Sequence, residues 1–299
     1  MLLKSVPKSC FNLFTWTLFI FLFQVHEVKG QYTDIINSNS PGNTMGAYSV
    51  GTGIYQAEGR FYVDRVTVDS LSSESLLNNG LLSIRIGLIK ENLEFVYDVM
   101  YTLDSSTSPV PGQKVGVDTG IYLNRIGVKY LVYDPEKRNN KPINVYSWNA
   151  NNKFSWRNLI PAIAIYAGTN LAISSSPFMV NYPSISPRAM LILQNHITSK
   201  WVTTINVVYD HIGNKSLADT NFIASLSHNL KPKWSLFVEG QYYKQGDYNE
   251  QVLRTGGAYL LKRNIQFDLF GGLNFKEAPK KRFVGMGFSF RIDNHKIKR

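Results

Sequence analysis

In this 299-residue chain, the side chains that could do chemistry are charged residues. They lie on one face of segments in which polar and apolar residues alternate. In GIYQAEGRFYVD, residues 53–64, Glu58 and Arg60 lie on the face opposite Tyr55 and Phe61. Every second residue of the segment is apolar or small, which is the period of a β-strand. The same polar face of later segments carries further charges: Arg85, Glu94, Asp98, Lys129, Glu239 and Arg291.

Charges enclosed by a closed sheet must be paired or hydrated, because an isolated buried charge is very costly. Two interpretations of these residues remain open. The first is a charged constriction that selects which molecules pass. The second is a set of salt bridges that stiffens a narrow barrel. The first and last strands of a closed barrel pair, so we expect Arg291 to approach Glu58 or Arg60.

Hydrolytic chemistry is a weaker interpretation, because no catalytic set falls on one face. In SLSHN, residues 225–229, the neighbours Ser227 and His228 would point to opposite faces of a strand and could not readily hydrogen-bond. The other histidines, His196, His211 and His295, show no metal-ligand spacing. The glycine pairs lack the helix and the Lys-Ser/Thr of a phosphate loop. We expect no enzyme activity, no catalytic residue, no metal and no cofactor.

The elements that must position these residues are twelve alternating segments, and no convincing helical period competes with them. They lie at residues 53–64, 81–89, 93–103, 121–133, 158–168, 188–197, 200–210, 220–230, 233–243, 252–261, 264–275 and 282–292. Only KEN separates the second segment from the third, which indicates a hairpin turn. The pattern predicts an all-β fold of antiparallel strands.

Loop lengths separate a membrane barrel from a soluble sandwich. Connections at 90–92, 198–199, 231–232 and 262–263 are tight, and those facing the other way are longer. Outer-membrane barrels show this two-sided pattern with an even strand number, whereas a sandwich predicts no such asymmetry. The insertion at 134–157 breaks the pattern and is either a periplasmic segment or two hidden short strands. We predict a closed antiparallel transmembrane β-barrel of outer-membrane type, with apolar faces toward lipid.

The two ends complete the predicted organisation. Residues 1–30 read as a signal peptide, with Lys4 and Lys8 before a short apolar run. Residues 31–52 are a periplasmic lead-in or a plug, residues 53–292 the barrel, and residues 293–299 a basic tail. The only cysteine, Cys10, precedes the apolar run. The net charge of +11 could attract nucleic acid, but export makes that partner unexpected.

Six stretches, in order and spacing, resemble the transporter-like outer-membrane barrels named after the meta-pathway of phenol degradation. They are NSNSPGNTMGAYSVGTGIYQAEG, LLSIRIGLIKENLEF, GVKYLVYD, LILQNHITSKW, ASLSHNLKPKWSLFVEGQYY and LRTGGAYLLKRNIQFDLFGGLNF. The resemblance runs from about Ile36 to Ile292 and implies a barrel of about twelve strands that passes or binds small molecules. The insertion at 134–157 and the seven-residue tail depart from the pattern.

These observations together lead to one expected function and one alternative. We expect a channel or transporter for small, hydrophobic or aromatic molecules in the outer membrane of a bacterium. The alternative is a non-conducting structural or surface-interaction barrel that works through the loops at 104–120 and 169–187. The expected partners are membrane lipid, a small-molecule substrate and the outer-membrane assembly machinery, with no nucleic acid.

Overall fold

The computed structural model describes residues 35–68, 73–107, 116–136 and 156–294, which contain twelve antiparallel strands. The signal-peptide prediction for residues 1–30 and most of the insertion and the tail lie outside the described residues and stay predictions. The strands are β1 (Ile54–Val68), β2 (Ser73–Gly87), β3 (Leu93–Thr107), β4 (Gly116–Tyr133), β5 (Ala162–Leu171), β6 (Ile185–His196), β7 (Trp201–Asp210), β8 (Asp219–Lys231), β9 (Trp234–Gln245), β10 (Tyr248–Lys262), β11 (Ile265–Asn274) and β12 (Lys280–Asp293).

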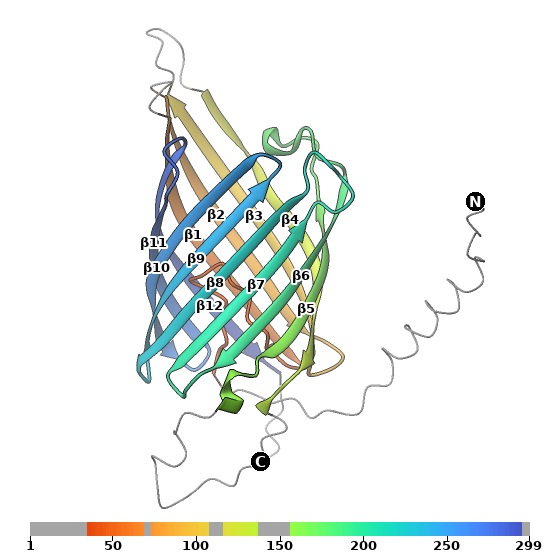
Figure 1. Cartoon of the computed structure of the whole chain (residues 1–299), viewed down its shortest axis with the longest axis vertical. Coiled ribbons are helices and arrows are strands. Elements are labelled where there is room, and N and C mark those ends of the chain that lie inside the picture. Colours follow the sequence, from red (N-terminus) through yellow and green to blue (C-terminus); the bar gives the residue numbers. More distant parts are fainter. Residues whose placement is uncertain (1–34, 69–72, 108–115, 137–155, 295–299) are drawn as a thin grey trace, which may run out of the picture. The chain divides into compact units, whose positions relative to one another are not determined.

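The strands close into one barrel, in which each strand pairs with its neighbours in sequence and β1 pairs with β12 (Figure 1). The closing register runs from Ile54 opposite Asp293 to Thr67 opposite Lys280. Closure leaves no unpaired sheet edge, which is the condition for a β-structure to span a bilayer. The predicted fold class is therefore confirmed, and each of the twelve predicted segments coincides with a strand.

The main differences lie at one end of the barrel. We call the end where β1 begins the near end and the opposite end the far end. At the far end β2 starts at Ser73 instead of residue 81, and β4 starts at Gly116 instead of residue 121. These extensions contain polar residues on both faces, such as Asn78 and Asn79, so alternation fades while the backbone ladder continues. The predicted far-end loops were consequently too long.

A second difference lies at the start of the fifth segment. Residues 156–159 form a short 3-10 helix, η3 (Trp156–Leu159), and β5 begins only at Ala162. Pro161 immediately precedes the strand, and proline cannot donate a hydrogen bond to the ladder. The part of the insertion at residues 137–155 lies outside the described chain, and the twelve strands above are sufficient to close the barrel.

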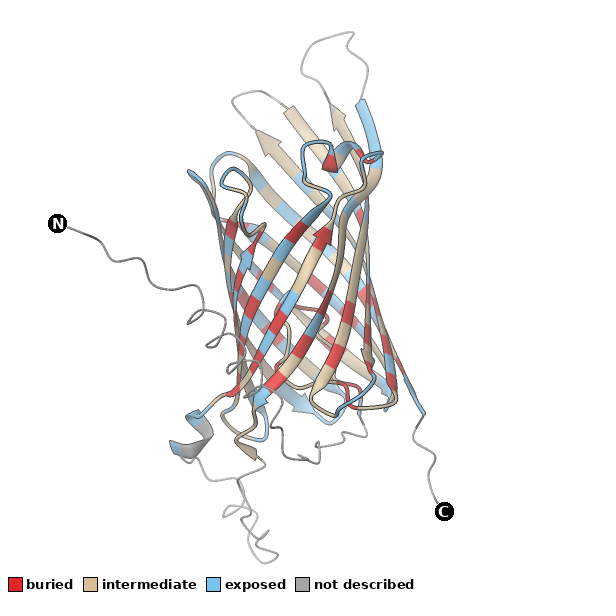
Figure 2. Cartoon of the chain, turned by 90° about the vertical axis from the view of Figure 1, so that its right-hand side faces the viewer, coloured by how far each residue is buried: buried red, intermediate tan, exposed pale blue. Residues whose placement is uncertain are grey.

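The outer surface of the barrel is apolar and its interior is polar. On β12, Val284 and Met286 are 67% and 60% exposed, while Ser289 and Arg291 are buried. Figure 2 shows the same alternation of exposed and buried positions along the strands. A soluble sandwich would bury the apolar face, so the observed arrangement is that of a transmembrane barrel. Among the described residues, no helix is long and apolar enough to cross a membrane.

Large side chains fill much of the interior, and glycines on the neighbouring strands leave room for them. A Cβ atom at Gly285 would touch the Cβ of Tyr62 and lie 2.7 Å from a ring carbon of Phe270. In the same way, a Cβ at Gly127 would overlap the phenol ring of Tyr166. These glycines are therefore places where an aromatic ring lies flat on the barrel wall.

Candidate functional site

Residues 35–50 lie inside the barrel and are called the plug below (Figure 1). The plug has no helix or strand, yet Ser40, Thr44, Ala47 and Val50 are buried. Its hydrogen bonds reach side chains of ten strands: β12, β2, β1, β11, β9, β8, β7, β6, β4 and β3. From Ser40 to Val50 the main partners progress around the barrel, from β11 through β9, β8, β7 and β6 to β3, while the long side chains of Arg60 and Lys129 reach Gly42 and Gly46 out of this order. The plug thus runs once around the inner wall.

Three carboxylates of the wall accept hydrogen bonds from backbone N–H groups of the plug. Glu58 on β1 accepts from Asn39 and Ser40, at 3.2 Å each for its Oε2 atom. Glu94 on β3 accepts from Val50 at 2.8 Å. The carboxylate of Glu239 on β9 accepts two N–H groups at 2.9 Å, those of Asn43 and Thr44. All three side chains are at most 1% exposed.

Four cations of the wall donate in turn to backbone carbonyls of the plug. The Nζ atom of Lys129 on β4 donates to the carbonyls of Gly46 and Tyr48, at 2.9 Å each. The other three donors and their acceptors are Arg60 to Gly42 at 2.7 Å, Arg85 to Asn37 at 2.7 Å, and Arg291 to Ile35 at 2.9 Å. The wall therefore satisfies both the donors and the acceptors of a segment that has no secondary structure of its own.

The same charges also pair with one another. Arg85 binds Glu94 through two parallel hydrogen bonds, Nε to Oε1 at 2.7 Å and Nη2 to Oε2 at 3.0 Å. Its third contact is with Glu58 at 3.1 Å, and Lys129 lies 3.2 Å from Glu94. Bidentate arginine pairs of this kind are strong and fix geometry. Glu239 pairs with Arg254 on β10, a residue that the sequence argument did not single out.

Seven of the eight charged residues singled out in the sequence thus bind the plug, and Asp98 is the exception. Asp98 accepts a 2.5 Å hydrogen bond from Ser83. Arg291 lies opposite Gln56 in the β1–β12 register, while Glu58 lies opposite Ser289. The guanidinium of Arg291 contacts the carbonyl of Ile35 and the carboxylate of Asp293.

Four amide side chains that sequence reasoning missed also hold the plug, and two of them, Gln56 and Gln266, donate to the carbonyls of Asn37 and Ser40 at 3.0 Å each. Asn206 on β7 pairs with Met45 as another peptide group would, accepting from its N–H at 2.6 Å and donating to its carbonyl at 2.9 Å. Gln194 on β6 accepts from the N–H of Ala47 at 2.8 Å. The only available signal was an amide on the polar face of a strand, which is too common to single out a residue.

The plug has an apolar side as well. Met45, Ala47 and Tyr48 pack against an apolar part of the inner wall on strands β3 to β7. The wall residues of this cluster are Val96, Leu131, Ala162, Ala164, Tyr166, Met190, Ile192 and Val208. Charged contacts therefore hold one side of the plug and apolar packing holds the other.

A cavity of about 1620 Å³ lies beside the plug at the near end, and we call it the vestibule. Plug residues between positions 35 and 48 form one side, and residues of β6 to β11 form the other, with Tyr133, Glu136 and Ile160 at the rim. Thr44 and Ser225 both line the vestibule and are joined by a 2.9 Å hydrogen bond. At the mouth, His196 contacts Glu136 at 2.7 Å, a hydrogen bond that holds the pKa of the Glu136 carboxyl below its usual range.

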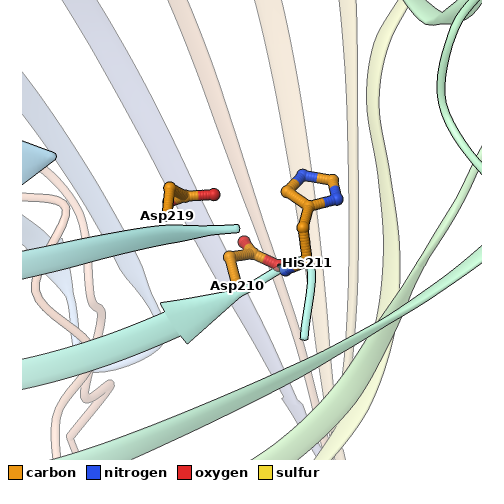
Figure 3. A group of neighbouring side chains, drawn as sticks. All are labelled: Asp210, His211 and Asp219. Atoms are coloured by element: carbon orange, nitrogen blue, oxygen red, sulfur yellow. Dashed lines mark hydrogen bonds between the residues drawn. The ribbon is translucent and has the colours of Figure 1, made fainter. Parts of the chain in front are cut away.

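A second group of titratable side chains lies toward the far end of the lumen, where Asp210, His211 and Asp219 converge (Figure 3). Two carboxylates and an imidazole could in principle hold a divalent cation. The Asp210 carboxylate, however, already binds Arg188, Arg125 and Asn170. The imidazole Nδ1 of His211 is 2.7 Å from the Ser186 hydroxyl. The group is therefore an ion-pair and hydrogen-bond network.

The segment SLSHN shows no catalytic arrangement in the structure. Ser227 lines the vestibule, whereas the His228 ring stacks on Trp201 of the outer surface, with ring centroids 4.1 Å apart. The two side chains thus point to opposite faces, as their adjacency in a strand requires.

Comparison with a solved structure supports the fold. An outer membrane channel from Pseudomonas putida F1 aligns with a TM-score of 0.54 and 9% identity, over 85% of this chain and 100% of that chain. The translocator domain of the autotransporter NalP from Neisseria meningitidis gives 0.48 and 9%, over 81% and 89%. The KdgM porin gives 0.42 and 10%, over 77% and 99%. At 9% identity the likeness to the first structure shows the fold alone, and the other two, with TM-scores under 0.5, add no argument.

Comparison with sequences gives the family. No curated protein matches the chain. A family model, described as "Putative MetA-pathway of phenol degradation", matches residues 38–292. That range covers most of the plug and all but the last residue of the twelve-stranded barrel. The chain is therefore a member of the family described as "Putative MetA-pathway of phenol degradation".

Proposed function

We propose that the protein is an outer-membrane channel for small, hydrophobic or aromatic molecules, and that the plug is its gate. The observation that carries the proposal is the attachment of the plug. Seven charged residues of the inner wall bind its backbone, although charges that only stiffened a barrel would need no partner beyond one another. The inner wall therefore acts as a binding surface for the plug.

Release of the plug is energetically plausible because most of its attachments are hydrogen bonds. Each such bond contributes only about 0.5–1.5 kcal/mol net, since water replaces the lost partner, with charged partners somewhat higher. A hydrated lumen would supply that water. Apolar packing is confined to a few plug residues such as Met45 and Ala47. A strand of the wall, in contrast, is held by backbone ladders on both sides.

The aromatic residues of the interior support the proposed substrate class. Tyr62 and Phe270 lie in the lumen with ring centroids 6.1 Å apart. The guanidinium of Arg254 lies over the ring of Phe283, with 5.0 Å between the guanidinium carbon and the ring centroid. Apolar and aromatic solutes bind to surfaces of this kind, on which a few polar groups fix the orientation. The outward apolar face meets membrane lipid, and insertion by the outer-membrane assembly machinery remains a prediction.

Conductance in planar lipid bilayers tests the gate. We expect the full chain to conduct little and a variant lacking residues 36–50 to show large, stable open events. Asp98→Asn is the matched control, because Asp98 lies on the same inner wall and bonds Ser83 instead of the plug. A deletion variant that inserts normally but stays closed would overturn the proposal and favour a non-conducting structural barrel.

Uptake of a small aromatic solute into proteoliposomes tests the substrate class. Toluene crosses lipid unaided, so protein-free liposomes and liposomes with the full chain both serve as controls. We expect the plug deletion to raise the protein-dependent rate. Equal rates in all three preparations would contradict passage of aromatic molecules.

A further inference from the structure

We propose that the vestibule is a binding site for a small organic anion with an apolar body, such as an aromatic carboxylate. The inference rests on the proposed function, because the ligand would be a molecule that the channel passes. It names a location and a charge for that molecule. Neither follows from the fold.

The mouth of the vestibule is positively charged. Lys200, Lys231 and Lys233 line it, from the β6–β7 and β8–β9 turns and their strand ends. Glu136 is the one carboxylate among the described residues that line the vestibule, and it contacts His196. A recess walled by low-dielectric protein focuses such a field and raises the local concentration of anions.

Below and between these lysines, the strands of the vestibule wall present two uncharged surfaces. Strands β8 and β9 contribute Ser225, Ser227 and Ser235, whose hydroxyl groups can bind an oxygen-bearing substituent. The neighbouring surface is apolar and is made by Phe237 with Ala258 and Leu260 of β10. A ligand with one apolar ring and one anionic group matches an apolar surface that lies beside hydroxyl groups and has lysines at the mouth.

The size of the vestibule fits such a ligand with accompanying water. Small-molecule sites usually measure about 300–1000 Å³, and the vestibule encloses about 1620 Å³. Plug residues such as Ile36 and Thr44 form one side of it, so a bound ligand would contact both the gate and the wall. The vestibule therefore couples ligand binding to the position of the plug.

Isothermal titration calorimetry of the full chain in detergent, with benzoate as the probe, tests the proposal. Benzamide has the same ring and shape but no charge, and a detergent-only titration corrects for partitioning. We expect saturable binding of benzoate and at least about fivefold weaker binding of benzamide. Failure of benzoate to bind, or equal affinity for the two compounds, would overturn the proposal.

Variants then locate the site. The triple variant Lys200→Gln, Lys231→Gln, Lys233→Gln should weaken benzoate binding at least about fivefold. The control is Lys90→Gln, Lys215→Gln, Lys244→Gln, which removes the same charge from exposed lysines that do not line the vestibule. Ser227→Phe should abolish binding by filling the space beside Phe237. Equal weakening by both triple variants would show general charge attraction and overturn the assignment.

These measurements are independent of the gating test. Benzoate binding is measured without a membrane or a voltage, and the conductance of the plug deletion is measured without benzoate. Loss of the channel proposal would therefore appear as absent conductance, and loss of the site as absent or unspecific binding.

Discussion

Glu94 and Lys129 lie directly opposite each other in the β3–β4 register, with 3.2 Å between Oε1 and Nζ, and both bind the backbone of the plug. Glu94 holds Val50, and Lys129 holds the carbonyls of Gly46 and Tyr48. Both side chains are fully buried. A single cross-strand ion pair thus anchors the end of the plug that leads into β1.

Removal of one partner of this pair should destabilise the protein and free the plug. Lys129→Met leaves two plug carbonyls, those of Gly46 and Tyr48, without their donor and removes one of the two cations that bind Glu94. Breaking a buried ion pair in this way costs about 3–5 kcal/mol. Thermal unfolding in detergent and bilayer conductance should show a lower Tm and more open events. Lys215→Met, at an exposed position, should change neither.

The middle of the plug depends on Glu239. Glu239→Ala removes the acceptor for the N–H groups of Asn43 and Thr44 and leaves Arg254 without its carboxylate. If the loss amounts to about 1.4 kcal/mol or more, the open probability should rise about tenfold. Single-channel recording measures this directly. Glu239→Gln keeps an acceptor oxygen and should open less often than Glu239→Ala. An unchanged open probability in Glu239→Ala would show that Glu239 does not help to hold the plug.

An engineered disulfide should lock the gate. The Thr44 and Ser225 hydroxyl oxygens are 2.9 Å apart, so Thr44→Cys with Ser225→Cys places two thiols close enough to bond. Cys10 is the only natural cysteine and lies in the predicted signal peptide. In a background that opens the channel, such as Lys129→Met, oxidation should close it and reduction should reopen it. In each single cysteine variant the oxidant should leave the conductance unchanged.

Acidification should weaken the protein through His211. Burial lowers the pKa of this imidazole, and the opposing attraction of Asp210 is smaller. A histidine with a lowered pKa in the folded state resists protonation there, so its contribution to stability is present above about pH 6.5 and is lost as the pH falls. Unfolding midpoints between pH 8 and pH 5 should show this loss. His211→Asn suits the positive φ of 51° and should flatten the pH dependence.

Glycines under aromatic rings should be essential for folding. Gly285→Ala would place a methyl group against Tyr62 and Phe270, and the backbone carbonyl of Phe61 lies only 2.7 Å from the same position. Gly240→Ala is the control, because nothing lies within 4 Å of its added Cβ. The heat-modifiable mobility shift of folded barrels in gel electrophoresis separates the outcomes. Normal folding of the Gly285 variant would show that the rings can move aside.

The barrel could be predicted from the sequence because its signal is local. Every second residue of a strand such as β12 faces lipid. The apolar residues therefore recur at alternate positions that are close in sequence, such as Val284, Met286 and Phe288. The charged inner face followed from the same alternation. A strand that extends beyond the lipid needs no apolar outer face, so the alternation ends before the strand does. The predicted starts of β2 and β4 at the far end were wrong for this reason.

The binding partners of the inner charges could not be predicted, because the plug carries no period. Its contacts join residues far apart in sequence, such as Thr44 and Glu239, and they use backbone atoms that every residue type possesses. Arg254, Asn206 and Gln194 escaped attention for the same reason. A polar residue on an inward face is ordinary, and its partner becomes visible only when the chain is folded.

The wall grips the plug mainly by peptide groups, and this has a consequence for how the protein can change. Glu58, Glu94, Glu239 and Lys129 hold N–H and C=O groups that remain when a plug side chain is replaced. Random substitution should therefore be tolerated better at plug positions such as Asn37 or Asn43 than at the wall positions that hold them. The wall positions are therefore expected to be the more constrained part of the attachment, and in the plug the constraint falls on tightly packed positions such as Gly42, where an added Cβ would lie 2.6 Å from Glu239.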